Sequence, residues 1–267
     1  MQAFHLIRLI PLWMTYSGMV AVVLLSVCAG FYLSCFLKKR SGKAEEGPVN
    51  TVVAGIMALL AFILAFTFGV TTSRFDARKE LLLNDVNAIE TTYLRTELIP
   101  EPYASEVRAL LIQYVDIRIE MFRHPENIAL IIKESERLQK LMWAHAAALA
   151  EADLKNADIV SLFVDSMNKM FDIQTQRITV GMIYRIPPVM WAALFALTLF
   201  SMFGVGFLFG NSGKLNWPLV ITLSLAFSAV ISLIADLDNS GTARPTFIQV
   251  NPQPLINLQQ RINGTSL

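Results

Sequence analysis

The chain has 267 residues, of which 54% are hydrophobic and 16% are charged, and its formal net charge at pH 7 is +1. Soluble domains average about 45–50% apolar and about 25% charged residues, so this composition excludes an ordinary soluble enzyme. The near-neutral charge gives no basic surface for nucleic acid, and we expect no nucleic-acid partner.

Four stretches of the chain lack any charged residue and are long enough to cross a bilayer as a helix, which takes about 20 residues. They are residues 9–37, 47–73, 186–213 and 215–235. Of the 43 Lys, Arg, Asp and Glu residues, 31 lie between Arg74 and Arg185. The sequence therefore predicts an all-α, four-span helical membrane protein with a helical-bundle insert between spans two and three.

The predicted organisation has four parts. We place a transmembrane hairpin at 9–73, a soluble helical bundle at 74–185, a second transmembrane hairpin at 186–236 and a polar tail at 237–267. The second span is expected to continue past Ser73 as one long helix, because good helix formers follow and no Gly or Pro occurs before Pro100. Apolar residues at helical spacing after Pro102 predict three further helices in the bundle.

The four predicted spans also bear on topology. An even number of crossings puts both termini and the insert on one side of the membrane. Seven Lys or Arg residues lie near the span ends on that side, against five on the two short loops, which favours a cytoplasmic insert by a small margin. We expect a multi-pass protein of the cell inner (plasma) membrane, with the lipid bilayer as its surroundings.

Motifs for catalysis or metal binding are missing from the sequence. The histidines His5, His124 and His145 are far apart, and no phosphate-binding loop or nucleophile elbow occurs. Cys28 and Cys35 share one face of the first span and are interpreted as buried thiols. The sequence therefore predicts neither an enzyme nor a resident cofactor.

Two patterns within the spans carry structural information. On the third span, Gly206 and Gly210 are four residues apart, which predicts a close helix-packing face. On the second span, bulky apolar residues recur at three- and four-residue steps, and two arginines follow. They are Leu59, Phe62, Phe66 and Val70, then Arg74 and Arg78. This face could simply contact lipid or the protein core, or it could form a hydrophobic constriction in a ring of identical subunits.

A family resemblance begins at the end of the second span. The segments Phe66–Lys79 and Asp85–Arg95 resemble the signature of the bestrophin-like family of bacterial four-span membrane proteins, and more distantly the bestrophin anion channels. The run from Asp236 to Asp238 and the later Pro254-Leu255-Ile256 are similar to that family's end. Relative to the channels, one residue is missing between Phe75 and Ala77.

Bestrophins are pentameric anion channels whose second helices line the pore and whose insert lies in the cytoplasm. The resemblance implies a homo-oligomer, a pentamer by analogy, that passes small inorganic ions, anions in particular. It implies a constriction at Phe62 and Phe66, flanked by Leu59 and Val70, with Arg74 and Arg78 at the pore mouth. The alternative hypothesis is a membrane-anchored interaction or sensing scaffold without conduction, and an enzyme acting on lipid is disfavoured.

The segment after the fourth span has a second possible meaning. Asp236, Asp238 and Ser240 supply oxygens at the spacing that begins a calcium-binding loop, with Gly241 at the sixth position. Position twelve is Phe247 and not the bidentate Glu that such a loop requires. A capped helix end with local turn bonding is therefore preferred over a calcium site at Asp236 and Asp238.

Overall fold

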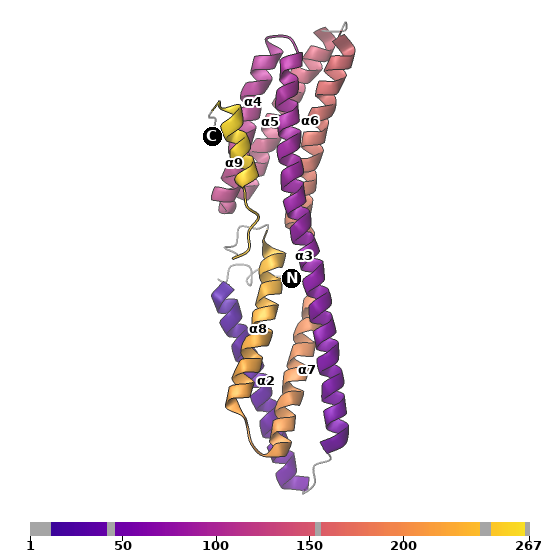
Figure 1. The fold of residues 1–267 in the computed structure, drawn as a ribbon, viewed down its shortest axis with the longest axis vertical. Coiled ribbons are helices and arrows are strands. Elements are labelled where there is room, and N and C mark those ends of the chain that lie inside the picture. The colour runs from indigo at the N-terminus through magenta and orange to yellow at the C-terminus, as the bar shows by residue number, and fades with distance from the viewer. Residues whose placement is uncertain (1–11, 42–45, 153–155, 241–246, 265–267) are drawn as a thin grey trace. The chain divides into compact units, whose positions relative to one another are not determined.

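The computed structural model describes residues 12–41, 46–152, 156–240 and 247–264 (Figure 1). These residues are almost entirely helical and contain no β-strand. The predicted start of the first span at residue 9 and the loop glycine Gly241 lie outside them. The described chain divides into two compact units. One holds residues 12–41, 46–74, 185–239 and 247–248, and the other holds residues 75–152, 156–184, 240 and 249–264.

The first unit, which we call the membrane unit, contains the apolar helices. They are α2 (Leu12–Ser41), the first half of α3 (Glu46–Arg95), α7 (Pro188–Ser212) and α8 (Trp217–Asn239). By length and apolar composition, four helical runs among the described residues could each cross a membrane. The predicted all-α, four-span fold class is therefore confirmed.

Helix α3 has 50 residues and appears as a single uninterrupted ribbon in Figure 1. It ends in the short 3₁₀ helix η2 (Thr96–Leu98), after which Ile99 is extended. This end follows from the sequence, because the prolines Pro100 and Pro102 cannot continue the helical hydrogen bonding. The predicted extension of the second span beyond Ser73 is confirmed.

The second unit, which we call the bundle unit, is built among the described residues by the second half of α3 with four other α-helices. They are α4 (Tyr103–Arg123), α5 (Ile128–Ala152), α6 (Ala157–Ile178) and α9 (Gln253–Ile262). Each contributes apolar side chains to one core at helical spacing, including the buried Leu111, Met142, Phe163 and Leu258. Burial of these stripes supplies most of the driving force for folding this unit.

The chain after α8 includes the short helix α9, which packs on the core of the bundle unit. Leu255 and Leu258 are fully buried in the bundle core. The Gln259 side chain donates a 2.6 Å hydrogen bond to Asp116 of α4, and Arg261 pairs with Glu90 of α3. Helix α9 is therefore an integral part of the bundle unit.

Candidate functional site

Helices α2 and α7 of the membrane unit are in close contact through glycines. A Cβ atom added at Gly206 would lie 1.9 Å from the carbonyl oxygen of Val27, and one at Gly210 would lie 2.4 Å from Cβ of Ser34. A Cβ added at Gly30 of α2 would lie 2.0 Å from the carbonyl oxygen of Phe203. The two backbones can approach this closely only because these positions carry no side chain.

The close approach of α2 and α7 predicts the effect of a small substitution. Gly206→Ala should force the two helices apart and lower the melting temperature of the detergent-solubilised protein, because overpacking costs about 1–3 kcal/mol. Gly18→Ala on α2 is the matched control, since a Cβ there has no atom within 4 Å. Equal melting temperatures for both variants would show that the glycine contact does not hold the helices together.

Helix α3 has two different faces within the membrane unit. Leu60, Leu64, Thr67 and Thr71 follow one another at helical steps and are buried against the chain's own helices. On the other side, Leu59 is 48%, Phe62 65% and Phe66 53% exposed, and Val70 is half-buried. A single chain therefore leaves the aromatic face of α3 uncovered.

Arg74 and Arg78, which follow this face along the chain, contact residues at and just after the end of α8. Arg78 is buried, in helical step with Thr71 on the packed side of α3, and its Nη1 donates a 2.8 Å hydrogen bond to Oγ of Ser240. Nη1 of Arg74 lies 3.9 Å from Oδ1 of Asp238 at the end of α8. Arg78 is thus directed into the chain's own interior, while the position of Arg74 and Arg78 at a pore mouth stays a prediction.

The two carboxylates at the end of α8 bond to the backbone of the membrane unit. Asp236 accepts hydrogen bonds from the N–H groups of Phe247 and Ile248, at 3.2 and 2.9 Å. Asp238 accepts one from the N–H of Ile186, at 3.1 Å. These bonds join residues 11, 12 and 52 positions apart, so they have a longer range than the local turn bonding that the sequence favoured over a calcium loop. Calcium binding at Asp236 and Asp238 stays a prediction, and among the described residues no group of three or more His, Cys, Asp or Glu could hold a metal ion.

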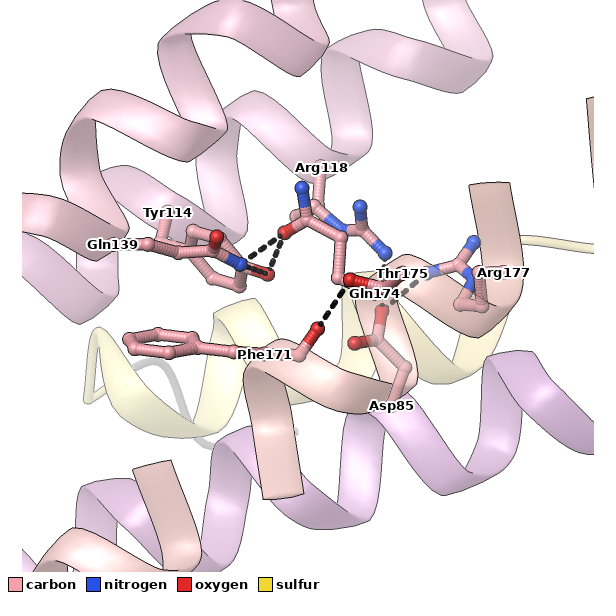
Figure 2. A network of polar contacts seen from close by, with 8 residues as sticks. All are labelled: Asp85, Tyr114, Arg118, Gln139, Phe171, Gln174, Thr175 and Arg177. Carbon is pink, nitrogen blue, oxygen red and sulfur yellow. Dashed lines mark hydrogen bonds and ion pairs between the residues drawn. The ribbon is translucent and has the colours of Figure 1, made fainter. Parts of the chain in front are cut away.

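A polar network occupies the interior of the bundle unit (Figure 2). Nη2 of Arg118 lies 2.7 Å from Oδ2 of Asp85, and Arg177 pairs with the same oxygen. Nearby, Tyr114 bonds to Gln174, whose Oε1 also accepts a 2.8 Å hydrogen bond from Gln139. The side chains of Asp85 and Arg118 are 0% and 1% exposed. The network therefore joins α3, α4, α5 and α6 by buried polar contacts.

The charges of the network stabilise one another. Burial alone would raise the pKa of Asp85, but the guanidinium groups of Arg118 and Arg177 outweigh it and hold that pKa below its ordinary value. For Arg118, burial opposes the charge while Asp85 restores it, so its pKa is raised. Burial, with the repulsion of Arg118, lowers the pKa of Arg177 to about 10. All three side chains are therefore charged at neutral pH.

The chain is similar to known proteins in both sequence and fold. Residues 19–240 match the family model described as the bestrophin-like domain. The chain belongs to the bestrophin-like family. The resemblance seen in Phe66–Lys79 and Asp85–Arg95 is therefore confirmed, and the bestrophin-like domain covers spans one to four and the bundle between them. The sequence matches no curated protein.

Several solved structures share this fold. They are crystal structures of single-residue variants of a bacterial bestrophin homologue from Klebsiella pneumoniae. An aspartate-to-alanine variant has a TM-score of 0.69 at 13% identity, covering 93% of this chain and 97% of that one. An isoleucine-to-threonine variant also has a TM-score of 0.69 at 13% identity, covering 93% and 98%. A leucine-to-threonine variant has 0.68 at 13%, covering 93% and 99%. At this identity the likeness establishes the fold.

The buried ion pair of Asp85 and Arg118 predicts how the stability of the protein depends on pH. Because the folded-state pKa of Asp85 is depressed, its stabilising effect is present above the unfolded pKa of about 3.9 and is lost as the pH falls through the folded value. Asp85→Asn should therefore melt well below the parent at pH 7, and the gap should narrow below about pH 4. Melting temperatures of both proteins across this range test it, and a gap independent of pH would contradict it.

Proposed function

We propose that this bestrophin-like protein is an oligomeric ion channel that passes small ions along an axis lined by α3. The observation that carries the proposal is the pair of faces on α3. One face packs within the chain's own membrane unit, whereas Leu59, Phe62 and Phe66 on the other remain uncovered. The four spans of one chain are too few to enclose a water-filled pore by themselves. A closed ring of identical subunits would cover this face and place it around a common axis.

The mechanism we propose is passive permeation through a hydrophobic constriction. Rings of Phe62 and Phe66 would form the narrow point, one helical turn apart, with Leu59 and Val70 flanking them. An apolar constriction of this kind excludes water and gates by dewetting. An ion inside it loses its hydration shell and gains little from the aromatic side chains in return, so the dry neck blocks flux.

The assembly we propose contains only copies of this chain in a lipid bilayer, with five copies implied by the resemblance. The insert and both termini are placed on the cytoplasmic side of the inner membrane, in keeping with the charge count near the spans. Small inorganic ions are the permeant species. The resemblance implies anions among them.

A second candidate function is a membrane-anchored interaction or sensing scaffold without conduction. The observation that favours it is a set of large apolar side chains exposed on the bundle unit. They are Leu94, Leu98, Leu130 and Trp143. Exposed apolar groups of this size are typical of surfaces that contact another protein, although single ones occur on any surface.

Native mass in mild detergent, combined with ion flux from reconstituted liposomes, separates the two functions. The channel predicts a closed higher oligomer whose liposomes lose an imposed salt gradient. The scaffold predicts liposomes that retain the salt gradient at every voltage and gradient tested. A monomer that retains its fold and conducts nothing would overturn the channel proposal.

A further inference from the structure

The exposed face of α3 continues beyond the aromatic residues at a seven-residue spacing. Phe66, Ser73, Glu80 and Asn87 are all exposed. Seven residues make nearly two turns of an α-helix, so residues at this spacing stay close to one face. The face that carries the proposed constriction therefore carries a carboxylate four turns further along the same helix.

The other charged side chains on this part of α3 do not offset Glu80 on that face. Arg78 is buried on the opposite side of the helix, bonded to Ser240. Lys79 pairs with Asp76, whose Oδ1 lies 3.5 Å from its Nζ, and lies over the ring of Phe75. The Asp76 and Lys79 charges cancel as a pair. Glu80 is thus the net charge that α3 presents on its exposed face beyond Phe66.

We propose that Glu80 is the selectivity residue of this channel and makes it prefer cations. The proposal rests on the proposed function, in which α3 lines the axis. Each subunit would add one full negative charge at the same depth, and rings of Glu or Asp side chains select cations. The aromatic edges at the constriction carry only partial positive charge, so the carboxylate ring dominates the potential along the axis.

This assignment reverses what the resemblance implies about the permeant ion. The anion expectation placed Arg74 and Arg78 at the pore mouth, but their side chains are directed to Asp238 and Ser240 of the chain itself. The carboxylate ring also predicts a salt dependence. Mobile ions screen charges beyond about 30 Å at 0.01 M salt and about 10 Å at 0.1 M, so the effect of Glu80 on conductance should be largest in dilute salt.

The test is the reversal potential of the full-length protein in planar bilayers under a KCl gradient. The reversal potential of the parent protein should be displaced from zero toward the equilibrium potential of potassium. Glu80→Gln should lower the potassium-to-chloride permeability ratio severalfold, and Glu80→Lys should move the reversal potential to the chloride side. Glu136→Gln is the matched control, since it removes one exposed carboxylate from α5 and should leave the ratio unchanged.

The possible results distinguish a failure of the role of Glu80 from a failure of the proposed channel function. A conducting parent whose permeability ratio is the same in Glu80→Gln and Glu136→Gln would overturn the role of Glu80 and leave the channel intact. A conducting parent that prefers chloride would do the same. A parent that conducts nothing would overturn the channel, and the selectivity assignment with it.

Discussion

Replacing Phe66 with alanine is expected to raise ion flux through reconstituted liposomes or to remove its gating. Phe66 is 53% exposed on the uncovered face of α3, so its ring contributes little to the packing of the single chain. In a ring of subunits this side chain would narrow the pore to a width that excludes water. Alanine would widen and wet this point, which lowers the cost of ion passage. Ion flux, followed with a fluorescent indicator in liposomes that carry the parent or Phe66→Ala at equal protein density, measures the effect.

The matched control for this variant is Phe163→Ala. Phe163 is 1% exposed in the core of the bundle unit, so its removal leaves a cavity that costs about 3–5 kcal/mol of unfolding free energy. Its melting temperature should fall without any rise in flux. If Phe66→Ala also changes only the melting temperature, α3 is a packing helix and the scaffold function is favoured.

Arg118→Ala is expected to destabilise the bundle unit strongly. Removing this guanidinium leaves the carboxylate of Asp85, which is 0% exposed, with Arg177 as its remaining ion-pair partner. Breaking a buried ion pair in this way costs about 3–5 kcal/mol, because a charge stays in the interior with less compensation. A large drop in the melting temperature of the full-length protein in detergent is the expected result.

Arg137→Ala supplies the control for this second prediction. Arg137 forms an ion pair with Glu134 on the exposed surface of α5, where solvent screens the attraction. Its loss should leave the melting temperature almost unchanged. A drop as large as that of Arg118→Ala would contradict the view that burial makes the Asp85 network important.

Much of the fold was predictable from the sequence for a plain physical reason. A bilayer requires long uncharged helices, so residues 47–73 and 215–235 are recognisable by composition alone. Pro100 and Pro102 mark the end of α3 because proline cannot donate the next backbone hydrogen bond. These signals are local in the sequence, and they place the elements without any knowledge of their contacts.

The packed and uncovered faces of α3 were harder to predict. The span is apolar on all sides, and Leu60 and Leu64 look no different in the sequence from Leu59 and Phe62. The position of Arg78 depends on Ser240, which lies 162 residues further along the chain. No local pattern indicates such a partner.

The sequence contains one indication of the buried network. Arg118 follows Leu111 and Tyr114 at helical steps on the apolar stripe of α4. A charged side chain on such a stripe has to find a buried partner, since an isolated buried charge is too costly to keep. That pattern could have identified Arg118, but the partner Asp85 on α3 depends on how the helices pack.

The position of α3 in the purified particle tests the channel account most directly, and cryo-electron microscopy in lipid nanodiscs can measure it. The account predicts a closed ring of identical subunits with α3 innermost, Phe66 at the narrowest point of the axis and Glu80 facing the same axis. A monomer or dimer in which the Phe62 and Phe66 face of α3 is turned toward lipid would contradict it.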